Sequence, residues 1–270
     1  MKLIELRNQL KQTFKENNIE VEDVDFIVSE VLDLKRTELV LIDCVDETEE
    51  LKIREFAEMR LKNIPVEKIF KKAYFYGLEF KVDENVLSPR SETEMLVEHA
   101  LTYIKQNDYK DVLDMCTGSG CVAVSIKKYA DVNITAVDIS SKALKIAKEN
   151  AKTNQVEINF IKSDMFTELD GKFDLIVSNP PYIDTDQIED LQPEVVNADP
   201  YIALDGGDMG MKYYNIIHDN LRKFLNDDGM ILLEIGEDQK DLIVALFNDF
   251  EFVDCIKDYA GLDRILIFKK

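Results

Sequence analysis

The segment SNPPYI, from Ser178 to Ile183, combines an amide side chain with two prolines. It overlaps the end of an apolar, β-branched run, 173–178, that is typical of a strand buried on both faces. Proline lacks an N–H and fixes φ, so this segment is expected to be stiff. The side-chain oxygen of Asn179 and the carbonyl of Pro180 could accept both hydrogens of an –NH2 group, and the Tyr182 ring could form a flat wall against a planar group. The pattern predicts a site for an amide or an exocyclic amine, built by Asn179, Pro180, Pro181 and Tyr182.

A glycine turn lies between another predicted strand and a helix. In the segment VLDMCTGSGCVAV, residues 112–124, Gly118 and Gly120 would let the backbone turn tightly and approach a ligand with no Cβ in the way. Asp138 closes the next predicted strand, 20 residues after Gly118 (138 − 118), where it could accept hydrogen bonds from a ribose diol. The combination predicts a nucleotide-type binding site.

The acidic character of this turn narrows the choice of ligand. A carboxylate such as Asp114, at the end of the strand, would repel a pyrophosphate and attract a cation. S-adenosylmethionine has adenosine for Asp138 to hold, no phosphate, and both an ammonium and a sulfonium group. Further along, Asp164 could bond the adenine amino group while Met165 or Phe166 packs on the ring. These residues favour S-adenosylmethionine as the ligand. The competing interpretation is that Asp114 and Asp138 only end a strand or cap a helix.

These residues need a parallel sheet to bring them together. The alternating patterns predict a helix at 91–105, strands at 111–115, 133–138 and 173–178, and helices that begin at Gly120 and Ser140. Such alternation predicts a doubly wound, Rossmann-like α/β sheet. Ligands of these sheets bind outside the carboxyl ends of the strands, so Asn179 would face the transferable methyl group.

A small helical domain is predicted before the sheet. Apolar residues recur at spacings of three and four up to about residue 63, beginning with Leu3, Leu6, Leu10 and Phe14. Aromatic and β-branched residues around Gly77 predict a hairpin. We therefore predict an N-terminal helical domain at 1–70, a hairpin and linker at 71–90, and a Rossmann-like methyltransferase domain at 91–270.

Composition excludes several classes of function. The 270 residues carry a formal charge of −21, which disfavours direct binding to nucleic acid. The four cysteines show neither metal-ligand spacing nor the framework of a secreted protein, so we predict no metal site. The amphipathic start MKLIELRNQLKQTF is not a signal peptide, and no apolar run approaches the roughly 20 residues that span a bilayer. We expect a reduced, cytoplasmic protein.

With these residues in place, the chain resembles the HemK/PrmC family of S-adenosylmethionine-dependent methyltransferases, which modify the glutamine of the Gly-Gly-Gln motif in peptide chain release factors. The resemblance covers nearly the whole chain. Its blocks are VLSPRSETEMLVE (86–98), LDMCTGSGCVAV (113–124), VSNPPYI (177–183), ALDGGDMG (203–210), LLEIGEDQ (232–239) and KDYAGLDRIL (257–266). The glycine turn and Asn-Pro-Pro-Tyr are shared by many amino-methylating enzymes, whereas PRSETE and DYAGLDR are much narrower.

The resemblance implies that the chain methylates release factors and leaves S-adenosylhomocysteine as product. It implies an acceptor site at 179–182, an adenine contact from Met165, and a helical region to about residue 85 that helps recognise the release factor. It implies that the cofactor is bound by Asp138 with Cys116, Thr117, Gly118, Ser119 and Gly120. Three positions depart mildly from the family pattern: Cys116 replaces a frequent glycine, Ser91 a usual proline, and Asp199 a common glutamate.

Two other functions compete with this interpretation. An adenine-amino methyltransferase of DNA or RNA would also bind a planar –NH2 group, but the charge of −21 and the lack of a recognisable nucleic-acid module disfavour it. A binding protein without turnover would not need the intact acceptor segment 179–182.

Overall fold

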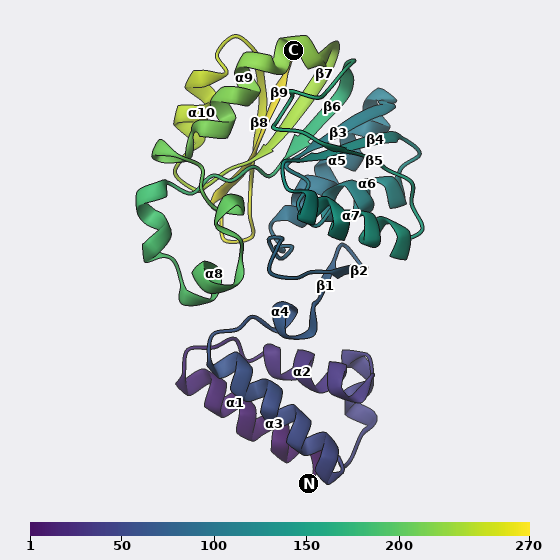
Figure 1. Ribbon diagram of the computed structural model, residues 1–270, viewed down its shortest axis with the longest axis vertical. Helices are drawn as coiled ribbons and strands as arrows, with labels where there is room; N and C mark the ends of the chain where they lie inside the picture. Colours follow the sequence, from purple (N-terminus) through teal and green to yellow (C-terminus); the bar gives the residue numbers. More distant parts are fainter. The chain divides into compact units, whose positions relative to one another are not determined.

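The computed structural model describes residues 1–270 as two compact units, and the larger one is built on a sheet of seven strands (Figure 1). In spatial order the strands are β5 (Asn159–Lys162), β4 (Asn133–Asp138), β3 (Asp111–Met115), β6 (Phe173–Ser178), β7 (Leu225–Glu234), β9 (Asp263–Lys269) and β8 (Glu251–Lys257). The pairs from β5 to β7 are parallel, and β9 runs antiparallel to both of its neighbours. The predicted doubly wound α/β sheet is confirmed.

Helices cover both faces of this sheet (Figure 1). On one face, α5 (Thr93–Asn107) and α6 (Cys121–Tyr129) share a buried core with Val112. On the other face, α9 (Lys212–Phe224) and α10 (Lys240–Leu246) share a core with Leu113. Helix α7 (Ser141–Thr153) lies beside α6 on the first face, where it contacts β4 and β5 and its Ala151 joins the core of Val112. Neighbouring residues of a strand point to opposite faces, so a strand that is covered on both sides, such as β6, is mostly apolar.

The order of the strands fixes where a ligand can bind. The chain passes from β3 through α6 to β4 on one side, and β6 lies on the other side of β3. This is the switch point at which doubly wound sheets bind ligands. The last residues of β3 and β6, Met115 and Ser178, lie opposite each other in the parallel register. The glycine turn and the Asn-Pro-Pro-Tyr segment therefore begin side by side.

The smaller unit is helical and consists of two separate stretches, Met1–Lys72 and Gln192–Ala198. Its helices are α1 (Leu3–Glu16), α2 (Asp23–Leu32), the 3-10 helix η1 (Arg36–Leu41), α3 (Glu47–Leu61), α4 (Val66–Phe70) and α8 (Pro193–Ala198). The buried Arg60 binds Asp23 at 2.6 Å and Glu194 at 2.7 Å. This division differs from the predicted one, which placed 192–198 in the methyltransferase domain and treated 71–90 as a hairpin and linker between the domains.

A hairpin of β1 (Lys72–Phe75) and β2 (Leu78–Lys81) follows the first helical stretch, as predicted. Tyr76 and Gly77 form its turn with φ of +49° and +73°, the left-handed conformation that tight hairpins use at both central positions. The loop after β6 contains three short 3-10 helices, η2 (Thr185–Asp190), η3 (Tyr201–Ala203) and η4 (Asp208–Gly210). None of the helices combines the length and the apolarity that crossing a bilayer requires.

Candidate active site

A cavity of about 1000 Å³, including its open mouth, lies at the carboxyl edge of β3, β4 and β6. Its walls include residues 85–90, 114–119, 137–140 and 163–165, together with Asn179 and Pro181. The charged residues that line it are Arg90, Asp114, Asp138 and Asp164. A pocket with three carboxyl groups and one guanidinium fits a cationic ligand better than a pyrophosphate.

The glycine turn forms the floor of this cavity and uses left-handed backbone. Cys116 has φ +64° and Gly118 has φ +54°. A Cβ built on Gly118 would meet no atom within 4 Å, so a ligand can approach the backbone there. The non-glycine residue Cys116 adopts a conformation that is unfavourable for side chains, in agreement with the frequent glycine at this position in the family it resembles.

Gly120 is the one predicted cofactor residue that does not line the cavity. It begins α6 with φ +80°, and a Cβ there would approach the Cβ of Ala147 to 2.9 Å. The position therefore needs glycine because α6 and α7 pack closely. The predicted cofactor contact of Gly120 stays a prediction beside this packing role.

Asp114 is buried at the end of β3, with its carboxylate turned toward the glycine turn. It accepts hydrogen bonds from Oγ1 of Thr117 at 2.6 Å and from the backbone N–H of Ala123 at 3.2 Å. Burial raises the pKa of Asp114 to about 7, although both hydrogen bonds act in the opposite direction. The geometry favours a role in holding the turn over the direct cation contact that the sequence suggested.

Asp138 links the glycine turn to the end of β4. Its carboxylate accepts from the backbone N–H of Gly118 at 2.9 Å and of Ser140 at 2.8 Å. A carboxylate has about four acceptor sites, so two hydrogen bonds leave capacity for the hydroxyls of a ribose. Burial raises the pKa of Asp138, and the backbone hydrogen bonds act against that shift.

Asp138→Ala should weaken S-adenosylmethionine binding by about 10- to 100-fold, because charged hydrogen bonds to the ribose are lost and the turn loses an anchor. Isothermal titration calorimetry measures this dissociation constant directly. Asp138→Asn keeps one acceptor oxygen and should lose less. An unchanged dissociation constant for Asp138→Ala would contradict the assignment.

Met165 and Asp164 line the cavity beside the turn. Met165 is buried, has φ +49°, and its Sδ lies 3.8 Å from Sγ of Cys116. The polarizable thioether of methionine makes favourable contacts with aromatic rings, so Met165 could pack on a purine. Burial raises the pKa of the Cys116 thiol, so this cysteine stays protonated and does not act as a nucleophile.

Only part of the Asn-Pro-Pro-Tyr segment faces the cavity. Asn179 and Pro181 line it, whereas Pro180 and Tyr182 do not. Side chains of an extended chain alternate in direction, so residues on either side of Pro181 point into the protein. Burial raises the pKa of the Tyr182 hydroxyl to about 12. Tyr182 is half-buried and lies outside the lining of the cavity, so its flat wall against the acceptor stays a prediction, as does the Pro180 carbonyl as an acceptor.

The Asn179 side chain has a defined orientation. Its Nδ2 donates to Oγ1 of Thr93 at 3.2 Å, which leaves Oδ1 as an acceptor for a ligand –NH2 group. Thr93 contacts the buried carboxyl of Glu234, whose Oε2 has no hydrogen-bond partner in the chain. Burial raises the pKa of Glu234 to about 7, and hydrogen bonds from Thr93 and Asn179 act in the opposite direction.

Glycines 206 and 210 let a second loop pack on this segment. A Cβ on Gly206 would lie 2.8 Å from the Cα of Tyr182, and a Cβ on Gly210 would collide with the Tyr182 carbonyl oxygen. Nε2 of Gln239 donates to that same oxygen at 2.8 Å and to the Met209 carbonyl at 3.2 Å. The blocks ALDGGDMG and LLEIGEDQ thus pack on the acceptor segment NPPY and fix its backbone.

An ion pair holds the part of the cavity wall formed by residues 85–90. The buried Asp199 accepts from Nη2 of Arg90 at 2.7 Å and from the backbone N–H of Ser88 at 3.3 Å. Sequence reasoning did not assign roles to Arg90, Thr93, Glu234 or Gln239. The only available signal was their place inside the blocks that carry the family resemblance.

The stability of the fold should depend on Glu234. Its pKa is about 7 in the folded protein against 4.5 for an ordinary glutamate, so the folded state binds this proton more tightly. The resulting stability is complete below pH 4.5 and is lost as pH rises to 7, by up to about 3 kcal/mol at roughly 1.4 kcal/mol per pKa unit. Urea unfolding of Glu234→Gln across this range should show a shallower decline than the wild type. Parallel curves would disprove the burial of an ionisable group here.

Comparisons with known proteins agree with the fold. The Methyltransferase small domain family matches residues 80–213, and the PrmC N-terminal domain matches residues 5–70. A methyltransferase from Pyrococcus furiosus shares the fold with a TM-score of 0.56 at 20% identity, covering 79% of this chain and 98% of that one. A ribosomal protein L11 methylase from Lactobacillus delbrueckii gives 0.51 at 23% identity, covering 69% and 82%. Fold and domain define an S-adenosylmethionine-dependent methyltransferase.

Curated relatives narrow this class. A release factor glutamine methyltransferase from Thermodesulfovibrio yellowstonii is 42% identical and covers 81% of each chain. Enzymes of the same name from Fusobacterium nucleatum and Clostridium acetobutylicum are 38% and 37% identical; each alignment covers 99% of this chain, and 78% and 98% of the relative. This chain belongs to the family of release factor glutamine methyltransferases.

Proposed function

We propose that this chain transfers a methyl group from S-adenosylmethionine to the side-chain amide nitrogen of a glutamine in peptide chain release factors, the glutamine of the Gly-Gly-Gln motif. The observation that carries the proposal is the orientation of Asn179. Its Nδ2 is engaged by Thr93, so its oxygen is presented to an –NH2 group beside the glycine turn. The family membership supports the same reaction and substrate.

In this proposal the residues of the chain hold the methyl donor and orient the glutamine amide toward it. S-adenosylmethionine supplies an electrophilic methyl group on its sulfonium sulfur. Residues 116–119, Asp138 and Met165 would hold it, and Asn179 with the Pro180 carbonyl would hold the two amide hydrogens of the glutamine. An amide nitrogen is a poor nucleophile because its lone pair is delocalised, so alignment of this lone pair with the S–CH3 bond is the main source of rate.

The transfer balances without a strong base. The carbon–sulfur bond breaks as the carbon–nitrogen bond forms, and the positive charge moves from sulfur to nitrogen. The amide nitrogen then loses one proton to solvent, which leaves N-methylglutamine and S-adenosylhomocysteine. We place this activity in the cytoplasm, with the helical unit assisting recognition of the release factor.

The test is methylation of a purified release factor in the presence of S-adenosylmethionine, with duplex DNA and RNA as parallel acceptors. We expect one added methyl group on the peptide that contains Gly-Gly-Gln, located on the glutamine by fragmentation. Methylation of nucleic acid without methylation of this peptide would overturn the proposal. That result would also show that the net charge of −21 does not exclude a nucleic-acid partner.

A further inference from the structure

Tyr259 is an exposed aromatic residue that the fold itself does not use. Its side chain is 94% exposed, and it lies in the loop of residues 258–262 between β8 and β9. Leu262, at the end of the same loop, is 40% exposed. By contrast, the ring of Tyr129, which is 53% exposed, packs edge-on against Tyr76. Tyr259 therefore contributes little to stability and is available to a partner.

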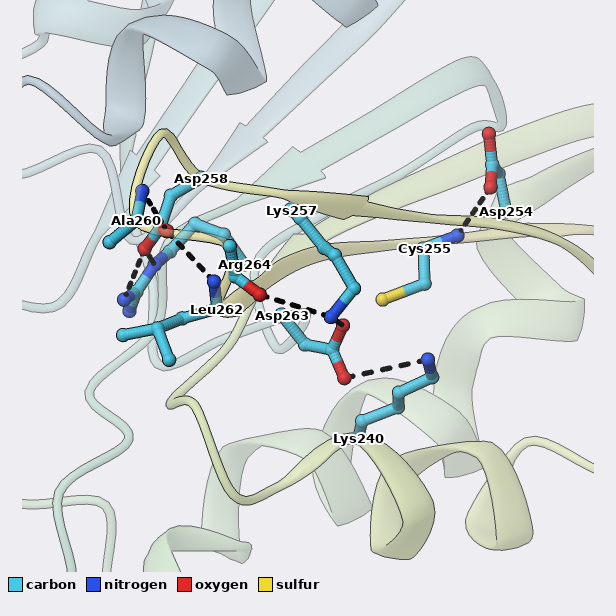
Figure 2. Close-up of polar contacts among 10 residues, drawn as sticks. Lys240, Asp254, Cys255, Lys257, Asp258, Ala260, Leu262, Asp263 and Arg264 are labelled. Carbon is cyan, nitrogen blue, oxygen red and sulfur yellow. Dashed lines mark hydrogen bonds and ion pairs between the residues drawn. The ribbon is translucent and has the colours of Figure 1, made fainter.

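The loop that carries Tyr259 is held from within by Asp258 (Figure 2). The Asp258 carboxylate accepts from the backbone N–H groups of Ala260 at 2.9 Å and Leu262 at 3.0 Å, and from Nη2 of Arg264 at 2.9 Å. The backbone N–H of Asp258 also donates to the Leu262 carbonyl at 2.8 Å. A loop with this many internal hydrogen bonds loses little conformational entropy when it binds.

A second group of charges braces the outside of the loop (Figure 2). Nζ of Lys257 donates to the Gly261 carbonyl at 3.1 Å and pairs with Asp263 at 2.8 Å. Lys240 of α10 pairs with the same carboxylate at 3.4 Å. The base of the loop is thus fixed to both the sheet and a helix.

The position of the loop relates it to the acceptor site. β9 is antiparallel to β7, so the loop before β9 lies at the carboxyl edge of the parallel strands, where Asn179 also lies. Arg264 ties the loop to the residue after Glu234, because its Nη1 donates to the Ile235 carbonyl at 3.2 Å. β9 is two strands from β6, a separation of about 10 Å. The loop therefore flanks the acceptor segment.

We propose that the loop 258–262 is a docking surface for the protein substrate, with the Tyr259 ring as the anchor that packs on an apolar side chain of the folded release factor next to its acceptor glutamine. This inference rests on the proposed function and adds a recognition element to it. Rigidly presented tyrosines are efficient anchors because they bury a large area at a small entropic cost. A folded protein bound at the acceptor site would also cover this loop.

The test compares the kinetics of Tyr259→Ala, Tyr259→Phe and Phe252→Ala with an intact release factor as substrate. Tyr259→Ala should raise KM for the release factor by about 30-fold, with kcat and the dissociation constant of S-adenosylmethionine unchanged. Tyr259→Phe keeps the ring and should stay within about 2-fold of the wild type. Phe252, which is 45% exposed at the far end of β8, serves as the control aromatic and should leave KM unchanged.

The outcomes separate the two proposals. An unchanged KM for Tyr259→Ala, with a wild type that methylates the release factor, would overturn the docking surface and leave the proposed function intact. A fall in kcat without a change in KM would also overturn it, because the loop would then act on chemistry. A wild type that methylates no release factor would overturn the proposed function itself.

Discussion

Asn179→Ala should reduce kcat by about 100-fold or more while S-adenosylmethionine binds with near-normal affinity. The substitution removes the acceptor that orients the amide –NH2 group, and a poor nucleophile depends on that orientation for its rate. The proposed cofactor contacts come from the turn after β3 and from Asp138, which the substitution does not touch. Single-turnover methylation of a release factor measures the rate, and calorimetry measures cofactor binding.

A second substitution, at Thr93, should give an intermediate loss of rate. Thr93→Val keeps Asn179 but removes the hydroxyl that accepts its Nδ2–H bond, so the amide can rotate out of its productive orientation. We expect a loss of rate between those of the wild type and Asn179→Ala, with partial recovery in Thr93→Ser, which restores the hydroxyl. Near-normal turnover of Asn179→Ala would refute the acceptor assignment.

Gly210→Ala should destabilise the fold by at least about 3 kcal/mol and disable the acceptor segment. Gly210 has φ +68°, where a side chain is strained, and its added Cβ would collide with the Tyr182 carbonyl oxygen and Nε2 of Gln239. The collision involves backbone on one side, so the Asn-Pro-Pro-Tyr segment must move to relieve it. Urea unfolding measures the stability, and turnover per folded molecule measures the displacement.

Gly171→Ala is the matched control for this prediction. Gly171 has φ +86°, but a Cβ there would meet no atom within 4 Å. It should therefore cost only about 1 to 2 kcal/mol, from backbone strain alone, with turnover unchanged. Equal losses of stability in the two variants would show that the contact with Tyr182 is unimportant.

Much of the sheet could be predicted because its chemistry is local. The strands at 111–115, 133–138 and 173–178 have the predicted bounds, since burial on both faces favours short, mostly apolar runs. The glycine turn and the turn after Asn179 could also be recognised in the sequence, because glycine and proline determine the backbone conformation at their own positions. The position of the site at the switch point followed from the alternation of strands and helices.

The partners of the site could not be predicted from periodicity. Asn179 and Thr93 are 86 residues apart, and Asp199 and Arg90 are 109 apart. A polar contact between distant segments has no repeating pattern that marks it in the sequence. The direction of the Tyr182 ring and the packing role of Gly120 likewise depend on neighbours that only the folded chain supplies.

The helical unit is built from two separate segments of the chain, and this limits how the enzyme can be re-engineered. Two stretches of chain, 1–72 and 192–198, build that unit, and Arg60 and Glu194 join them. A cut after residue 72 would leave a buried guanidinium short of one carboxylate, which is costly in a dry interior. Exchange of the helical unit between relatives as a single N-terminal segment should therefore fail. A working chimera must transplant residues 192–198, which lie between β6 and α9, along with the first 72 residues.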